Sequence, residues 1–402
     1  MRQDHRKTMY ACFIGYIVQA IVNNFAPLLF VKFQSSYGIT LEKITLLITV
    51  NFMIQLCTGA GDGCRPKLIC AVLRANYRAS AVLAHIFAAA GLVLLTVLPD
   101  ALPDAYAGIL ISVAVYAVGG GLLEVIISPI IEACPTDNKE KAMSLLHSFY
   151  CWGHVGVVLV STVFFALFGT DSWKLLALAW AAVPVFNLVI FAVAPIYTLP
   201  GSGDDGMGFS GLFRSRIFWI FMLMMVCAGA SEQAVGQWAS TFAEKGLGVS
   251  KAVGDLAGPM AFAFMMGLSR IIFSRSSGKF DMERFLKFSC MLCMASYLCI
   301  VFIPSPVVGL LGCSVCGFAV GMLWPGTYSM ASAALPGGGT VMFSLLALAG
   351  DVGCTSGPTL AGLVSSACGG NLRAGILAAL AFPLLMLVGV LLSRKALLPR
   401  EK

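Results

Sequence analysis

The chain has 402 residues, of which 59% are hydrophobic and only 11% are charged. This composition lies far outside the range of soluble globular proteins and indicates a polytopic membrane protein. The formal net charge is +7. No stretch could form a soluble domain with a basic face, so nucleic-acid binding is not expected.

Apolar runs of about 18 residues or more predict an all-α membrane protein with twelve transmembrane helices. The runs are continuously apolar rather than alternating, which favours helices over a β-barrel. The first six spans are predicted near residues 10–31, 44–61, 79–98, 106–131, 142–169 and 173–197. The second six are predicted near residues 216–243, 252–274, 285–303, 306–334, 340–367 and 373–394.

The basic residues of the predicted loops indicate the orientation. With a cytoplasmic N-terminus, the inner segments hold 20 of the 26 Lys and Arg residues and the outer loops hold 6. This bias predicts that both termini are cytoplasmic.

Segment 198–215 is rich in Gly and Asp, and we expect a flexible cytoplasmic linker there. It would separate an N-terminal six-helix bundle, residues 1–197, from a C-terminal six-helix bundle, residues 216–402. Ser144-Leu145-Leu146 recurs 200 residues later as Ser344-Leu345-Leu346, a weak repeat that fits two pseudo-symmetric halves.

Amide side chains occur in the first two predicted spans. Gln19 and Asn23 are four residues apart, as are Asn51 and Gln55, so each pair shares a helix face. Asn24 follows directly after Asn23. Amides can bind the hydroxyls of a solute, but they also link helices to one another, and both interpretations remain open.

Glu124 lies in the fourth predicted span of a chain that is expected to keep its Lys and Arg residues out of such spans. An ionised carboxylate at the centre of a span costs roughly 2.5–3.5 kcal/mol, so we expect a functional role. Gly119, Gly120 and Gly121 allow close helix approach, and Ser128 lies one turn further on the same face. Glu124 is therefore our main candidate for a proton-coupling group, with helix packing as the alternative.

The fifth predicted span carries His147, Cys151 and His154 at i, i+4 and i+7, with Tyr150 between them. Imidazoles on one face could relay protons to Glu124. His147 could instead hydrogen-bond a solute, as could Tyr150, and helix packing is the alternative. A metal site here would need further ligands and is not expected.

The seventh predicted span contains Glu232, which we expect to bind solute hydroxyls or to couple an ion. Sugar recognition calls for amides that bind hydroxyls and for aromatic rings that cover the apolar ring face. The second half supplies Gln233, Gln237, Trp238, Trp324 and Tyr328 for these purposes.

Asp351 lies in the eleventh predicted span, between Gly350 and Val352. Proton coupling, cation coordination and a structural role all remain open for this residue. The 14 cysteines form neither a disulfide framework nor a zinc spacing. Cys290 and Cys293 form a C-x-x-C in the ninth span without nearby His or Cys partners, so no metal or other cofactor is expected.

Six plus six spans joined by a cytoplasmic linker resemble the major facilitator superfamily, and the resemblance covers the whole chain. Within that superfamily the chain is most similar to the fucose:proton symporter group. The motifs that carry this likeness are Asn23-Asn24 leading to Phe33-Gln34, and Gly121-x-x-Glu124 followed by Ser128-Pro129.

The resemblance also has departures. Members of that group with a proton-linked Asp in the first helix carry it where this chain has Pro27, so Glu124 would act without that partner. The superfamily's signature loops correspond to irregular segments after the second and eighth spans. The residues that the resemblance implies for gating are Asp62, Arg65, Arg78, Arg270 and Arg275.

The resemblance implies alternating-access transport of a small polar solute, a sugar, with proton symport, by a monomer in a bacterial cell membrane. Sodium coupling, uncoupled transport and a drug or metabolite exporter of the same fold remain open, because fold does not determine substrate. A channel would favour pore-lining rings from an oligomer, and an enzyme a clustered nucleophile or metal motif. Neither pattern is found, so an enzyme is not expected.

Overall fold

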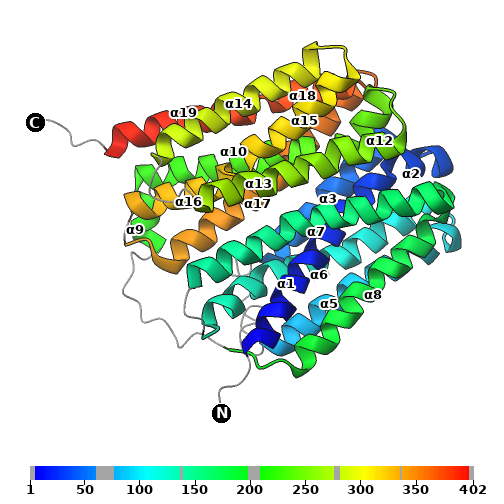
Figure 1. Ribbon diagram of the computed structural model, residues 1–402, viewed down its shortest axis with the longest axis horizontal. Coiled ribbons are helices and arrows are strands. Elements are labelled where there is room, and N and C mark those ends of the chain that lie inside the picture. Colours follow the sequence, from blue (N-terminus) through cyan, green and yellow to red (C-terminus); the bar gives the residue numbers. More distant parts are fainter. Residues whose placement is uncertain are drawn as a thin grey trace, which may run out of the picture. The chain divides into compact units, whose positions relative to one another are not determined.

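The computed structural model describes residues 5–59, 77–135, 139–197, 209–275, 281–335 and 337–397. Within these ranges, 12 helices are long and apolar enough to cross a membrane, and no β-strand occurs. The predicted all-α fold with twelve spans is confirmed. The chain divides into two compact units, Met1–Gly201 and Ser202–Lys402 (Figure 1).

The helices of the first unit form six spans. They are α1 (His5–Asn24), α2 (Phe30–Tyr37), α3 (Leu41–Gly59), α5 (Tyr77–Ala101), α6 (Ala105–Ala133), α7 (Lys139–Phe168) and α8 (Trp173–Val193), with short 3-10 turns at η1 (Ala26–Leu29) and η3 (Thr170–Ser172). α5 packs against α6 and α8, and α1 packs against α6, α7 and α8. α6 therefore lies at the centre of this unit, because α3 also packs on it.

The second unit also forms six spans, several of which are interrupted. Its elements are α9 (Phe209–Arg214), α10 (Arg216–Gly236), α11 (Ala239–Thr241), the π-helical η4 (Phe242–Gly246), α12 (Lys251–Asp255), the π-helical η5 (Leu256–Met260), α13 (Ala261–Arg275), α14 (Met282–Phe302), α15 (Pro306–Val320), α16 (Leu323–Ala334), α17 (Gly339–Ala367), α18 (Leu372–Ala379) and α19 (Ala381–Leu397). α10 packs most extensively against α17 and also contacts α19, α16 and α15.

The first span differs from the continuous helix predicted for residues 10–31. It extends over His5–Tyr37 and is interrupted after Asn24, where Pro27 lies in the turn η1. Proline has no N–H group and cannot continue the helical hydrogen-bond ladder. The seventh span is interrupted in the same way between α10 and α11, at Gln237 and Trp238.

The segment predicted as a linker contains helical structure. Residues 198–208 lie outside the described residues, but Phe209–Arg214 forms the short helix α9, which packs against α10. The extent of the linker predicted for residues 198–215 stays a prediction.

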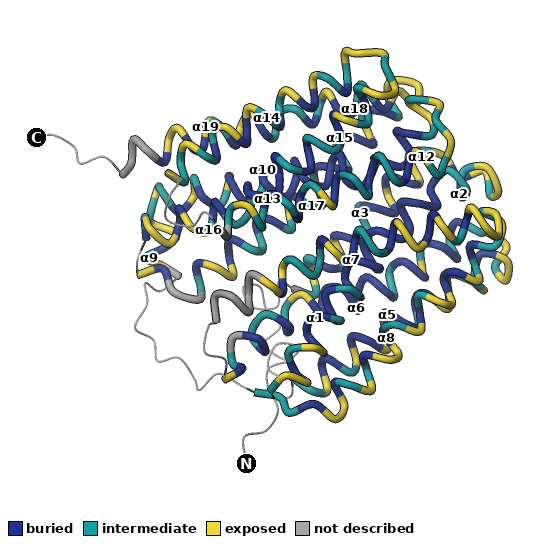
Figure 2. Tube along the Cα trace, viewed as in Figure 1, coloured by how far each residue is buried: buried dark blue, intermediate teal, exposed yellow. Residues whose placement is uncertain are grey.

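Large apolar side chains cover the outward faces of the spans. Figure 2 shows that the long helices carry buried and exposed stretches side by side. Leu167 and Val193 are each 72% exposed and Phe186 is 62% exposed. Such a surface would be unfavourable in water but matches the hydrocarbon core of a bilayer.

Glycines bring α10 and α17 into backbone contact. A Cβ atom on Gly353 would lie 2.0 Å from the carbonyl oxygen of Val226, and one on Gly357 would lie 2.3 Å from that of Ala230. On the facing helix, a Cβ on Gly229 would lie 2.2 Å from the oxygen of Gly350. Small residues at such interfaces allow the close van der Waals packing that associates helices in lipid.

We predict that Gly353→Ala destabilises the protein by roughly 1–3 kcal/mol, because the added methyl group forces α10 and α17 apart. Gly156→Ala on α7 is the matched control, since a Cβ there meets nothing within 4 Å. Thermal unfolding in detergent should show a lower midpoint for the first variant and no loss for the second. Equal midpoints would contradict this packing.

Candidate functional site

Four buried amide side chains form one hydrogen-bonded cluster between α1 and α3. Gln19 Nε2 donates to Gln55 Oε1 at 2.9 Å, and Gln55 Nε2 donates to Asn23 Oδ1 at 2.7 Å. Asn51 Nδ2 donates to the same Asn23 oxygen at 3.4 Å. The structure therefore brings together all four residues that the sequence placed as two pairs.

The amide cluster is short of hydrogen-bond donors. Gln19 Oε1 and Asn51 Oδ1 are buried, and within the described part of the chain neither atom accepts a hydrogen bond. Leaving a buried acceptor unsatisfied costs about 1–3 kcal/mol. The cluster thus holds two carbonyl oxygens that a ligand with hydroxyl or N–H groups would satisfy.

The three glycines before Glu124 place α6 against its neighbours, as the sequence suggested. A Cβ on Gly120 would lie 3.1 Å from Gln19 Oε1, and one on Gly121 would lie 2.8 Å from the backbone of Gln55. Gly119 faces α5 instead. Glu124 lies one turn beyond Gly120, and it is exposed rather than buried.

Side chains of α1 contact both α6 and α7. Tyr16 Oη lies 3.2 Å from Ser128 Oγ, and the Tyr16 ring makes an edge contact with His147 at 5.5 Å between centroids. Asn24 Nδ2 donates to Ala20 O at 2.9 Å and lies 3.5 Å from Tyr150 Oη.

The two histidines of α7 are in different environments. His147 is exposed, whereas His154 is buried at 4% exposure. His147 therefore remains a candidate to bind a solute or to transfer a proton. His154 is packed among neighbouring side chains.

Glu232 in the second unit is buried and faces a basic residue. Arg270 Nη2 lies 3.9 Å from Glu232 Oε2, and Gln233 Nε2 lies 3.3 Å from Glu232 Oε1. Gln237 Nε2 donates to Gln233 Oε1 at 3.1 Å, which extends the polar chain along α10.

Arg270 corrects the expectation that Lys and Arg residues stay out of the spans. It was assigned to a gating loop, but it lies within α13, inside the candidate span Lys251–Phe273. Its Nε donates to the carbonyl oxygen of Gly321 at 3.2 Å, at the break between α15 and α16. A charge is tolerated there because an acid and a backbone carbonyl compensate it.

Trp238 does not offer its ring to a solute in this structure. It is 1% exposed, and its Nε1 donates to the carbonyl oxygen of Pro358 on α17 at 3.0 Å. Trp238 therefore joins the break in the seventh span to α17.

Trp324 and Tyr328 lie near one another on α16. Their ring centroids are 6.5 Å apart, and the Tyr328 ring lies 5.5 Å from that of Phe343. Trp324 also covers the surface of Gly350, next to Asp351. Asp351 is partly exposed, and its backbone carbonyl accepts from Thr355 Oγ1 at 3.0 Å.

Of the remaining gating candidates, only Arg78 has a described side chain. It donates to the carbonyl oxygen of Ala192 near the end of α8, so it contacts a helix C-terminus. Asp62 and Arg65 lie outside the described residues, and Arg275 is described as the last residue of α13 but without its side chain.

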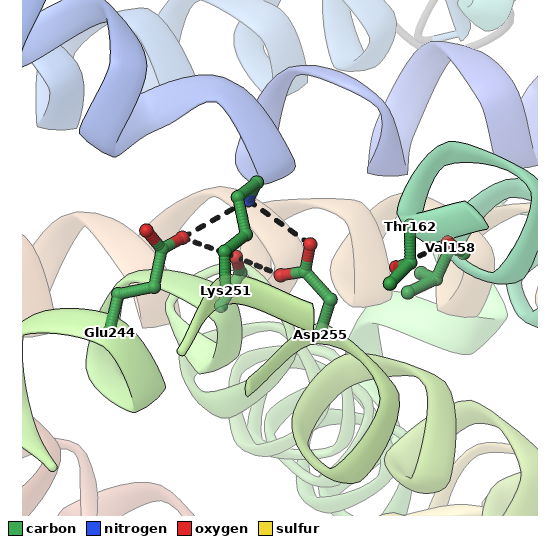
Figure 3. A network of polar contacts seen from close by, with 6 residues as sticks. Val158, Thr162, Glu244, Lys251 and Asp255 are labelled. Carbon is green, nitrogen blue, oxygen red and sulfur yellow. Dashed lines mark hydrogen bonds and ion pairs between the residues drawn. The ribbon is translucent and has the colours of Figure 1, made fainter. Parts of the chain in front are cut away.

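A charged network at the start of α12 was missed by sequence reasoning. Lys251 Nζ lies 3.0 Å from Glu244 Oε1 and 3.1 Å from Asp255 Oδ2, as Figure 3 shows. Ser240 Oγ donates to Asp255 Oδ1 at 2.5 Å. The i, i+4 spacing of Lys251 and Asp255 could have identified this pair.

A second missed group connects three helices of the first unit. Asn187 Nδ2 on α8 lies 2.8 Å from His85 Nε2 on α5 and 3.0 Å from the carbonyl oxygen of Ala11 on α1. Both side chains are fully buried. Single polar residues of this kind act as interhelical links.

The C-x-x-C of the ninth span has thiol neighbours, contrary to the prediction. Cys316 on α15 contacts Cys293 on α14, and Cys313 lies close by. These thiols are buried. Among the described residues, no group of three or more ligating side chains is arranged to hold a metal ion.

Residues 9–358 match the Major Facilitator Superfamily. The chain belongs to this family. The predicted family is confirmed by this match, and the members of the family are transporters. No curated protein sequence matches the chain.

Solved structures show the same fold at low sequence identity. A variant of the E. coli fucose:proton symporter FucP is 16% identical, with a TM-score of 0.65 over 96% of this chain and 98% of that chain. A bacterial homolog of the human lysosomal transporter Spinster, inward-facing and unoccupied, is 14% identical, with a TM-score of 0.75 over 98% of both chains. At these identities the likeness establishes the fold alone.

We predict that Lys251→Met destabilises the protein by about 3 kcal/mol, because the buried Asp255 and the partly buried Glu244 then lack their cation. Adding Asp255→Asn should restore part of the loss. Lys245→Met is the control, since Lys245 is exposed on the same segment. Thermal unfolding midpoints in nanodiscs measure all three, and a Lys251→Met protein as stable as the control would contradict the network.

Proposed function

We propose that this protein is a secondary active transporter that moves a small hydroxylated solute, a sugar, across the cell membrane by alternating access, together with protons. It would act as a monomer with both termini in the cytoplasm. The observation that carries the substrate class is the buried amide cluster Gln19, Asn23, Asn51 and Gln55, with its two carbonyl oxygens that lack a donor.

A sugar suits this cluster because its hydroxyl groups supply hydrogen-bond donors. The amides bind one another in the structure, and Gln19 Oε1 and Asn51 Oδ1 are closed to solvent. Entry of a sugar between α1 and α3 would exchange amide contacts for hydroxyl contacts and remove both unsatisfied acceptors. An apolar drug would leave all four amides desolvated without new partners, which disfavours the exporter alternative.

Proton coupling is proposed for Glu124. Its carboxyl group is exposed on α6, one turn from the glycine that contacts Gln19, and Ser128 on the next turn connects to His147 through Tyr16. A carboxylate in this position can gain a proton from one side of the membrane and lose it to the other as access alternates.

We predict that Glu124→Gln reduces concentrative sugar uptake by at least about ten-fold and removes its dependence on pH. Exchange of sugar across the membrane without a gradient should persist, because the amide cluster is intact. The assay is radiolabelled uptake into proteoliposomes, with Glu42→Gln as the control at an exposed position of α3.

Unchanged uptake and unchanged pH dependence in a folded Glu124→Gln protein would contradict the role of Glu124. Uptake that follows a sodium gradient rather than a proton gradient would contradict proton symport. Transport of apolar cations without any sugar transport would contradict the substrate class.

A further inference from the structure

Arg270 is a charged side chain inside a membrane span, and its partners include an acid and a backbone carbonyl. Its Nη2 faces the Glu232 carboxylate on α10 at 3.9 Å, and its Nε donates to the Gly321 carbonyl at 3.2 Å. α13 approaches the break in the tenth span closely, because a Cβ on Gly321 would lie 2.8 Å from the carbonyl oxygen of Met266. The guanidinium group is thus fixed at a junction of the seventh, eighth and tenth spans.

The contact with Glu232 is an ion pair at long range. A charge-assisted hydrogen bond between nitrogen and a carboxylate oxygen is about 2.7–2.9 Å long, and the pair here is separated by 3.9 Å. Glu232 also lies 3.3 Å from the amide nitrogen of Gln233. The side chains of Arg270 and Glu232 remain 18% and 11% exposed, so neither is sealed completely within the second unit.

The charge of this pair depends on the proton of Glu232. With Glu232 ionised the two charges cancel, whereas protonation of Glu232 removes its negative charge from the pair. An anionic ligand can then take the place of the Glu232 carboxylate beside Arg270. A carboxylate is the group that guanidinium binds best, through two parallel N–H···O hydrogen bonds.

We propose that Arg270 is an anion-binding residue of the second unit and that the solute it binds is a sugar that carries a carboxylate. This inference rests on the proposed function and narrows its substrate class. A proton on Glu232 favours the sugar acid, because it removes the carboxylate that competes for Arg270. In return, the bound sugar acid favours the protonated form of Glu232. Gln233 and Gln237 extend along α10 to receive the hydroxyl groups.

Other titratable side chains on the helices around Glu232 bear on the pH dependence. On α10, α14, α15, α16, α17 and α18, such side chains are Arg216, Cys227, Glu283, Arg284, Lys287, Cys290, Cys293, Tyr297, Cys299, Cys313, Cys316, Tyr328, Asp351, Cys354 and Arg373, and α9 adds Arg214. Asp351 is the acid of α17, the helix that packs most extensively on α10, so Asp351→Asn separates its contribution. Arg373 lies on α18, and its Nη1 donates to the carbonyl oxygens of Val301 and Ile303 at 3.1 and 3.2 Å.

Ligand binding to the purified full-length protein in nanodiscs tests the inference. The probes are D-glucuronate, its neutral isostere D-glucuronamide, and D-glucose, and dissociation constants are measured by calorimetry at several pH values. We expect glucuronate to bind at least about ten-fold more tightly than glucuronamide, as one charge-assisted pair supports. Its affinity should fall as the pH rises and Glu232 loses its proton.

Substitutions at Arg270, Glu232 and Arg373 test which residue causes the preference for glucuronate over glucuronamide. Arg270→Gln should remove the preference for glucuronate, and Arg270→Lys should keep part of it. Glu232→Gln should make glucuronate binding tight and independent of pH. Arg373→Gln is the matched control, because it also removes an arginine that binds backbone carbonyls, and it should leave the preference unchanged.

The results that overturn the inference are distinct from those that overturn the proposed function. If wild-type protein binds glucose or glucuronamide as tightly as glucuronate, the carboxylate is not recognised, although sugar transport stands. A preference for glucuronate that survives Arg270→Gln in a folded protein excludes Arg270 as its cause. If none of the three sugars binds, both the inference and the sugar proposal fail.

Discussion

The structure depends on one constraint, which is that a polar side chain in lipid must find its partner inside its own helix bundle. In the first unit this constraint joins Asn187 to His85 and gathers the amide cluster between α1 and α3. In the second unit it pairs Arg270 with Glu232. Two carbonyl oxygens of the amide cluster, Gln19 Oε1 and Asn51 Oδ1, do not satisfy it, and the proposed function assigns a ligand to them.

Hydropathy and helix periodicity were sufficient to predict much of the fold. Twelve spans follow from the lengths of the apolar runs, and the amides of the first two spans were expected to share faces, which they do. The breaks were harder to predict. Pro27 is a visible signal for the interruption in the first span, whereas the break in the seventh span, at Gln237 and Trp238, contains no proline.

Side-chain partners could not be predicted because hydropathy reports the depth of a residue in the membrane and not the rotation of its helix. The Trp238 ring is of a type that can stack on a sugar. In the structure it lies at the break between α10 and α11, and its Nε1 donates to the carbonyl oxygen of Pro358. The pairing of Arg270 with Glu232 was not predicted, because the acid lies 38 positions earlier in the sequence, on α10. Lys251 and Asp255 lie at the boundary of a predicted span. Charged residues are common at such boundaries, so these two did not indicate a charged network.

Proton movement that accompanies sugar entry tests the central claim most directly. Purified protein is reconstituted into liposomes that contain a pH-sensitive dye, without any initial ion gradient, and D-glucose or D-glucuronate is added outside. The account predicts that the lumen acidifies as the transported sugar enters, at a rate that follows sugar uptake. Sugar uptake at the same rate with an unchanged lumenal pH would contradict it.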